Sequence, residues 1–162
     1  MLLISNDRYF RTGVEYLVNN IPPHRIRDLM IVDSSFAIYI MDASWFNKQC
    51  FKEPFEAFLY CNNFLFNKKI DASLFLKTIN NYKNDKKFDT LITICEREVI
   101  LSICKGISPK KIASYSQRSE KTISTHKMSA LNKLNFKDVV TLYTLLYFWE
   151  SNLSLIRNLS TA

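Results

Sequence analysis

The sequence is poor in the residues on which metal sites, phosphate-binding loops and catalytic centres depend. Its 162 residues include two glycines, two histidines and four cysteines, which are Cys50, Cys61, Cys95 and Cys104. The cysteines form no CxxC pair and have no histidine nearby, so we expect free thiols and no zinc site. The sequence also has no nucleophile–base pair and no phosphate loop. It therefore predicts a protein that is not an enzyme and needs no cofactor.

Long apolar runs are missing as well. No run is long enough to span a bilayer and no signal peptide is recognisable, so we expect a cytoplasmic, nucleoid-associated protein with no membrane partner. The hydrophobic content of 48% is sufficient for real cores, and the length suits one or two small domains. The polar stretch NNYKNDKKFD is interpreted as a linker over residues 80–89. It separates an N-terminal domain over residues 1–79 from a C-terminal domain over residues 90–162.

Positive charge is concentrated in one segment of the C-terminal half. The segment from Lys105 to Lys137 contains eight Lys and Arg residues and a single acid, Glu120, which gives it the same formal charge of +7 as the whole chain. A concentration of basic residues on a small helical domain is typical of proteins that bind double-stranded DNA. The alternative is a solvated basic face on a three-helix packing module.

The same segment has clear helix start and stop signals. Thr93 and Glu96 have the spacing of a capping box, so a helix is expected to begin after Thr93. Gly106 stands where a left-handed residue would end that helix. Ser108 followed by Pro109 then provides an N-cap and a first helical position.

A third helix follows closely. Ser119 is a suitable N-cap, and Asn135 tolerates the left-handed geometry that ends a helix. The second and third helices are expected over residues 109–115 and 120–134, and these are the lengths of a helix-turn-helix.

The segment resembles the DNA-binding domain of LuxR/FixJ/NarL-type bacterial regulators, whose pattern is roughly LTxREREVLxLxAxGxSNKEIAxxLxISxxTVKxHxxxIxxKLxV. The run RSEKTISTHKMSALNKL is most similar to the Rcs-phosphorelay subgroup. The sequence also departs from the pattern: among other changes, Cys95 replaces the usual Arg, Ser116 a core Leu, and Ser124 a common base-reading Lys. The matching positions are Thr93, Glu96, Arg97, Glu98, Val99, Gly106, Ser108, Lys110, Ile112, Ala113, Thr122, His126, Lys133 and Leu134.

The resemblance makes the third helix the one that enters the major groove. Ser124, Thr125 and Met128 share one helix face, and in the family these positions point to the bases. His126 is expected to be a packed or phosphate-facing position and not a ligand or catalyst. Residues suited to phosphate contacts lie around the recognition helix. They are Lys110, Lys111, Ser119, Lys121, Thr122, Lys127 and Lys133.

The C-terminal segment predicts a further helix that is apolar nearly all round. Asp138 is a plausible cap, and VVTLYTLLYFW follows it. A small domain cannot bury every side of such a helix by itself, so a second buried surface is required. The resemblance implies a fourth helix that forms the dimer contact, with Val140, Tyr143, Leu146 and Tyr147 on that face. The alternative is that this helix packs on the N-terminal half.

The N-terminal half shows strands that alternate with helices. This order predicts an α/β fold with a mainly parallel sheet, followed by an all-α four-helix helix-turn-helix domain. The expected strands are residues 2–5, 29–32, 36–41 and 64–66. Helices are expected after the cap Asn6, over residues 51–61, and over residues 72–82 after the cap Asp71.

That order resembles a shortened response-regulator receiver domain. IYIMDAS is similar to the receiver's third strand, which makes Asp42 the phospho-acceptor position. The stretch from Asp42 to Asn67 is about half as long as in the family, so one helix and one strand are missing. The receiver's acidic pair falls on Ser5 and Asn6.

Phosphorylation needs a Mg²⁺ ion bound by carboxylates and a cation near the transferred phosphoryl group. The receiver's lysine falls on Asn67, and Asp7 and Lys68, one residue away from the required places, are expected to point elsewhere. We therefore interpret the N-terminal half as a degenerate receiver in which Asp42 is inactive.

Together these features predict a sequence-specific DNA-binding transcriptional regulator that acts as a dimer and independently of phosphorylation. Its partners are expected to be double-stranded DNA, a second copy or a related regulator, and RNA polymerase. The alternative is an auxiliary co-regulator that acts mainly by heterodimerising with a full-length response regulator. Ser124 favours this alternative, whereas the retained basic helix argues against a role without DNA.

Overall fold

The computed structural model describes residues 1–81 and 92–161. The chain divides into unit 1, which is Met1–Lys87 with Phe148–Ala162, and unit 2, which is Phe88–Tyr147. The sequence analysis placed residues 90–162 in a single domain, whereas the structure groups residues 148–162 with the N-terminal half. Most of the expected linker, residues 82–89, lies outside the described residues.

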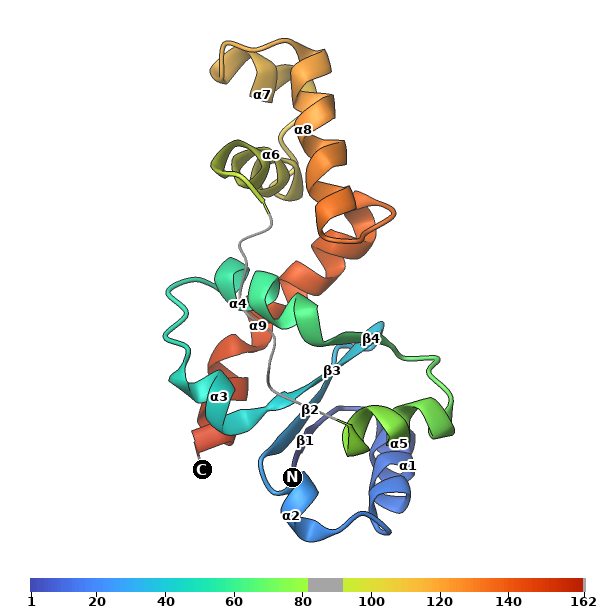
Figure 1. The fold of residues 1–162 in the computed structure, drawn as a ribbon. Coiled ribbons are helices and arrows are strands. Elements are labelled where there is room, and N and C mark those ends of the chain that lie inside the picture. Colours follow the sequence, from blue (N-terminus) through green and yellow to red (C-terminus); the bar gives the residue numbers. More distant parts are fainter. Residues whose placement is uncertain (82–91, 162) are drawn as a thin grey trace. The chain divides into compact units, whose positions relative to one another are not determined.

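Unit 1 contains a four-stranded sheet in the order β1-β2-β3-β4 (Figure 1). The strands are β1 (Leu2–Ile4), β2 (Leu29–Asp33), β3 (Ala37–Asp42) and β4 (Leu65–Asn67). Only β1 and β2 are parallel, and the β2–β3 and β3–β4 pairs are antiparallel.

The expectation of a mainly parallel sheet is therefore wrong, and the reason lies between β2 and β3. Only residues 34–36 separate these strands, whereas a parallel connection needs a dozen residues or more. Ser35 adopts a left-handed φ of 70°, and the Ser34 N–H donates to the carbonyl oxygen of Ala37 over 2.9 Å. The connection is a tight hairpin, which reverses the direction of β3.

One face of the sheet is covered by α1 (Arg8–Val18) and α5 (Ala72–Asn80), and the short α2 (Pro23–Ile26) precedes β2 (Figure 1). Side chains alternate between the two faces of a strand, and those on this face pack against the two helices. The cluster includes Val14, Val18, Ile31, Ile38, Ile40, Phe75 and Ile79.

The opposite sheet face is also buried, and the end of the C-terminal helix helps to cover it. This helix, α9, spans Val139–Thr161. The ring of Trp149 lies edge-on to that of Tyr39, with 5.2 Å between the ring centroids, and Arg157 donates to the carbonyl oxygen of Phe51 over 2.6 Å. Hence the last part of α9 packs on the N-terminal half, as the alternative interpretation of this helix proposed. The elements α3 (Ala43–Lys48), α4 (Pro54–Cys61) and η1 (Asn62–Phe64) lie between β3 and β4 along the chain.

Unit 2 is helical throughout its described part. It contains α6 (Ile94–Cys104), α7 (Pro109–Tyr115), α8 (Glu120–Lys133) and the beginning of α9. A small core of Val99, Ile112, Ala113 and Ile123 joins α6, α7 and α8. Among the residues that the structure describes, no helix is long and apolar enough to cross a membrane.

Candidate nucleic-acid interface

The three helices of unit 2 begin at the caps that the sequence predicts. The hydroxyl oxygens of Thr93, Ser108 and Ser119 accept backbone N–H groups three residues ahead, over 3.3, 3.4 and 3.1 Å. Each bond satisfies a donor that the first helical turn leaves free. The capping box at Thr93 is complete, because the Glu96 carboxylate also accepts the Thr93 N–H over 2.7 Å.

The same helices end in left-handed residues. Gly106, Gln117 and Asn135 have φ values of 77°, 51° and 59°. After each of them, the next N–H bonds to a carbonyl oxygen five residues back, over 3.0, 2.9 and 2.9 Å, which is the Schellman arrangement. The sequence predicts Gly106 and Asn135 at these positions. It gives no signal for Gln117, because glutamine seldom adopts this conformation.

The buried carboxylate of Glu96 ties α6 to α8. Ser129 donates to its Oε1 over 2.6 Å, and Lys133 donates to its Oε2 over 2.8 Å. Burial alone would raise the pKa of Glu96, but the bonds from Lys133, Ser129 and Thr93 outweigh it and lower the pKa to about 2. The sequence analysis recognised Glu96 only as a capping residue, because its partners on α8 are distant in sequence.

This contact assigns Lys133 a structural role. Its ammonium lies 2.8 Å from a carboxylate that is only 5% exposed, so its charge is already neutralised inside unit 2. This ion pair fixes the end of α8 against α6, and a contact of Lys133 with phosphate stays a prediction.

The face of α8 expected to read bases is open to solvent. Ser124 and Thr125 are exposed, and Met128 is 46% exposed. On the inward side, Ile123 and Ala130 are buried, as their spacing predicts. The Thr125 hydroxyl donates to the carbonyl oxygen of Lys121 over 3.0 Å, which leaves its lone pairs free to accept.

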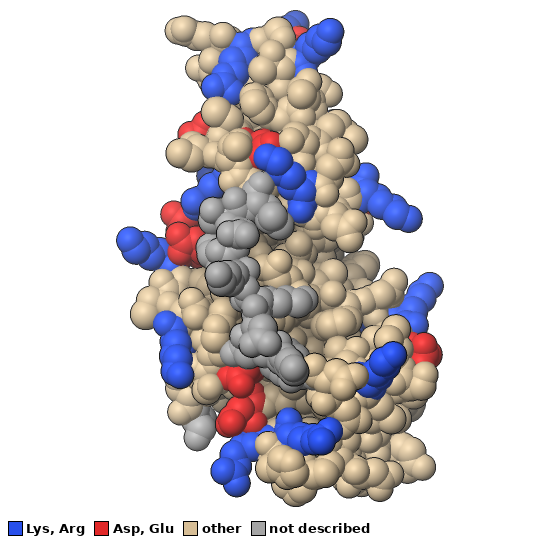
Figure 2. All heavy atoms as spheres, viewed as in Figure 1, with Lys and Arg blue, Asp and Glu red and all other residues tan. Residues whose placement is uncertain are grey.

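The remaining candidates for phosphate contacts lie on α7 and on α8 with its N-cap. Lys110, Lys111 and Lys121 are exposed and Lys127 is half-buried. The hydroxyls of Ser119 and Thr122 lie 2.9 Å apart at the N-terminus of α8. In the view of Figure 2, Lys and Arg side chains project where unit 2 carries α7 and α8, and few acids are visible there.

His126 is a packed position. It is half-buried, and its Nε2 lies 3.1 Å from Nη1 of Arg118.

The four candidate dimer residues separate into two groups on α9. Val140, Tyr143 and Tyr147 are 73%, 43% and 57% exposed, whereas Leu146 is 2% exposed. The rings of Tyr143 and Tyr147 stack, with 6.2 Å between their centroids. Leu146 belongs to the buried side of the helix, so it cannot form part of an exposed dimer surface.

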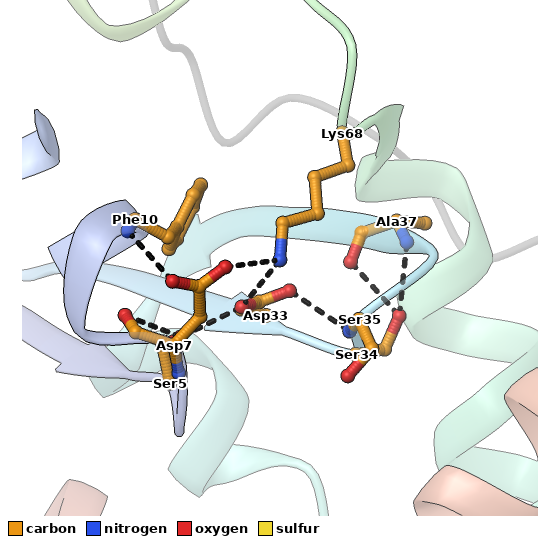
Figure 3. A network of polar contacts seen from close by, with 8 residues as sticks. All are labelled: Ser5, Asp7, Phe10, Asp33, Ser34, Ser35, Ala37 and Lys68. Atoms are coloured by element: carbon orange, nitrogen blue, oxygen red, sulfur yellow. Dashed lines mark hydrogen bonds and ion pairs between the residues drawn. The ribbon is translucent and has the colours of Figure 1, made fainter.

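Acidic and basic residues also converge in unit 1, around Asp33 at the end of β2 (Figure 3). Its Oδ2 accepts the Ser5 hydroxyl over 2.6 Å and the Lys68 ammonium over 3.0 Å, and its Oδ1 accepts the Ser35 N–H over 2.8 Å. Lys68 also reaches Asp7 over 3.2 Å. The expectation that Asp7 and Lys68 point elsewhere is wrong, because the loops after β1 and β4 turn both side chains toward Asp33.

Lys68 supplies the positive charge of this network. Burial acts to lower the pKa of its ammonium, but the bonds to Asp33 and Asp7 outweigh burial and raise the pKa. The pKa of Asp7 is lowered, chiefly by the Phe10 N–H that it accepts as the cap of α1 and then by Lys68.

Asp42 lies at the opposite end of the β2–β3 pair from Asp33. It pairs with Leu29, the first residue of β2, whereas Asp33 is the last residue of that strand. Its Oδ1 accepts the Trp45 N–H over 2.7 Å and so caps α3. Because the hairpin reverses β3, Asp42 does not join the carboxylate and lysine cluster.

Comparison with known proteins agrees with the geometry of unit 2. Residues 91–146 match the family model described as bacterial regulatory proteins, luxR family. These residues, about a third of the chain, are similar to the LuxR family of regulators. The chain is also similar to the response regulator protein VraR of Staphylococcus saprophyticus, with 32% identity over 83 residues, 51% of this chain and 39% of that protein. VraR proteins of Staphylococcus aureus strain Mu3 and Staphylococcus epidermidis are 31% identical over the same lengths.

The LuxR-family match confirms the helix-turn-helix interpretation of these residues. It starts at residue 91 and therefore covers none of the N-terminal half. The chain spans about two fifths of the length of the curated relatives it matches. No solved structure matches the chain.

Proposed function

We propose that this protein is a transcriptional regulator that binds a two-part site in double-stranded DNA as a dimer, without control by its own phosphorylation. The observation that carries the proposal is the exposed face of α8 in a LuxR-family domain. Ser124, Thr125 and Met128 occupy that face, and exposed lysines lie on α7 and α8. A cytoplasmic, nucleoid-associated location and contact with RNA polymerase belong to the same proposal.

Affinity and sequence choice come from different residues in this arrangement. The exposed lysines, with the hydroxyls and N–H groups at the start of α8, suit phosphate oxygens, which position a protein on DNA but carry no sequence information. The base-reading side chains are short or apolar. Met128 suits a thymine methyl group, and the hydroxyls of Ser124 and Thr125 suit either base edge that they reach.

Dimer formation rests on the exposed part of α9. Val140, Tyr143 and Tyr147 leave an apolar surface uncovered in the single chain, and exposed apolar patches of this kind mark interaction sites. Two copies would place two recognition helices about one DNA turn apart, as a two-part site requires.

Independence from phosphorylation rests on the network at Asp33. Both of its oxygens accept hydrogen bonds and its side chain is 3% exposed. Among the described residues no group of three His, Cys, Asp or Glu side chains could hold a metal ion. The N-terminal half then serves as a degenerate receiver that contacts partners, and similarity to the Rcs-phosphorelay subgroup is part of the same proposal.

The test is to select binding sites from random duplexes with the full chain and with α8 variants. Replacing Ser124 by Lys and Met128 by Ala should change the preferred half-site while non-specific binding stays within about twofold. If both variants select the same site as the natural sequence, the recognition face is misassigned.

A second candidate function is that of an auxiliary co-regulator. Ser124 stands where the family commonly has a base-reading Lys, and this supports a partner that supplies most of the sequence choice. The same selection, repeated with a full-length response regulator present, distinguishes the two. A co-regulator gives an enriched site only in the mixture.

A further inference from the structure

We propose that a groove in unit 2, between α6, the end of α7 and the start of α8, binds a small zwitterion, namely an α-amino acid with a large apolar side chain. The groove has a volume of about 480 Å³, which lies in the range of small-molecule sites. Such sites have an apolar lining and a few polar groups that fix the orientation of the ligand.

The floor of the groove is apolar and rigid. It consists of Val99, Ile112 and Ile123, which are 4%, 7% and 1% exposed and belong to the core of unit 2. Half-buried Ile107 closes one end. An apolar side chain placed here gains the free energy of burial without any rearrangement of the helices.

Ser116 keeps the groove open. Its hydroxyl turns back to donate to the carbonyl oxygen of Ile112 over 2.7 Å, so the side chain adds almost no volume to the wall that it lines. The family pattern has a leucine at this position, and a leucine side chain would fill this part of the groove.

Two opposite charges line the same groove. Arg118 donates Nη2–H to the Cys95 sulfur over 3.2 Å, and its Nη1 lies beside His126. A guanidinium has five donors, so others stay free for a ligand. Within residues 1–81 and 92–161, neither Arg118 nor Glu98 makes an ion pair.

The order of the two charged groups along the groove suits an amino acid. Cys95, Glu98 and Ser102 line the groove from one face of α6. Arg118 contacts the sulfur of Cys95, and Glu98 follows one turn later, about 4.5 Å further along the axis. The ligand carboxylate would bind Arg118, its ammonium Glu98, and its side chain would cover Val99 toward Ile107.

Charge complementarity excludes the simpler ligands. A plain carboxylate would bring its negative charge near Glu98, and a plain amine would bring its positive charge near Arg118. Only a zwitterion satisfies both groups while its side chain covers the apolar floor.

Calorimetry on the full chain tests the proposal with three probes: L-phenylalanine, 3-phenylpropionate, which lacks the ammonium, and phenethylamine, which lacks the carboxylate. Phenylalanine should bind at least about fivefold more tightly than either analogue, the advantage of one partly solvated ion pair. Glu98→Gln should remove the advantage over phenylpropionate only, and Arg118→Gln the advantage over phenethylamine only.

Ser116→Leu is the control for the cavity. It should leave the thermal melt unchanged or raised and abolish phenylalanine binding. Bound phenylalanine should also slow alkylation of Cys95 while leaving the exposed Cys50 unaffected. Absence of phenylalanine binding, equal binding of phenylpropionate, or undiminished binding to the correctly folded Ser116→Leu variant would overturn the proposal.

Discussion

Single side chains in unit 2 have separable effects on its stability and on DNA binding. Glu96 accepts hydrogen bonds from α8 and from its own N-cap, so replacing it removes contacts between two helices. Lys121 is exposed on α8, so replacing it should change only the contacts that this surface can make with DNA. We therefore expect replacement of Glu96 to change stability and replacement of Lys121 to change DNA affinity.

Replacing Glu96 by Gln should lower the free energy of unfolding by about 2 kcal/mol at pH 7. The folded-state pKa is lowered to about 2 from an ordinary value of 4.5. The charge therefore stabilises the fold fully above about pH 4.5, and this stabilisation is lost as the pH falls toward 2. Urea denaturation between pH 2 and 7 measures it.

The matched control is Glu98→Gln on the same helix, which should cost little because Glu98 is exposed. A difference between wild type and Glu96→Gln that stays constant down to pH 2 would contradict the assignment of the charge.

Replacing Lys121 by Ala should weaken binding to all duplexes alike. Each lost phosphate contact should reduce the slope of log K against log salt concentration by about 0.9, because fewer counterions are released. Lys133→Ala is the comparison, since its ammonium is held by Glu96. It should lower the melting temperature and leave the salt slope nearly unchanged. Fluorescence anisotropy over a salt series measures both slopes, and equal slopes for Lys121→Ala and wild type would remove Lys121 from the interface.

At the scale of elements, the helices of unit 2 follow local signals and the sheet of unit 1 does not. Thr93, Ser108, Ser119 and Gly106 act on the backbone within a few residues, so the sequence alone locates these helix ends. The direction of β3 depends on a three-residue hairpin at Ser35. The parallel sheet was expected from the general order of strands and helices, although no helix was expected between the strands at residues 29–32 and 36–41.

For a related reason, the sequence could not predict that Asp7, Asp33 and Lys68 lie close together. These residues lie up to 61 positions apart, and only the strand order brings them to one edge. Leu146 presents the same difficulty on α9. A helix that is apolar nearly all round has no periodic signal to separate its buried side from its exposed side.

The exposed and buried sides of α9 should respond differently to aspartate. The double change Tyr143→Asp and Tyr147→Asp should abolish the dimer and leave the melting temperature within a few degrees, because both rings are exposed. Leu146→Asp should unfold unit 2, since it buries an unpaired charge. Sedimentation equilibrium with thermal melts separates the two results. A dimer that survives the double change would move the interface elsewhere.

At the scale of the whole molecule, α9 joins the two units covalently through one helix. Its first part belongs to the LuxR-family match, and Trp149 and Arg157 of its last part pack on the sheet of unit 1. A local pattern could not reveal this division, because the helix reads as one continuous apolar segment. The control of the whole chain therefore depends on whether unit 1 accepts a phosphoryl group.

We predict that incubation with a small-molecule phosphodonor and Mg²⁺ leaves the intact mass of the protein unchanged. Asp33 is buried with both oxygens engaged, and a Mg²⁺ ion placed beside Asp7 and Asp33 would meet the ammonium of Lys68 instead of a third carboxylate. Octahedral Mg²⁺ binds oxygen ligands, and the oxygens of Asp33 already accept hydrogen bonds from Ser5, Ser35 and Lys68. Asp42 pairs with Leu29, at the opposite end of β2 from Asp33, and so lies away from this cluster.

Accordingly, Asp42→Ala should leave DNA binding within about twofold of wild type, because the change removes a helix cap in unit 1 and no group of the recognition helix. Asp33→Asn should lower the thermal stability of unit 1, because it leaves the Lys68 ammonium with one carboxylate partner in place of two. A stoichiometric, base-labile mass gain that disappears in either variant would place a working phospho-acceptor at that residue. Reporter output should then also depend on the phosphodonor, whereas control by assembly predicts that output follows protein concentration alone.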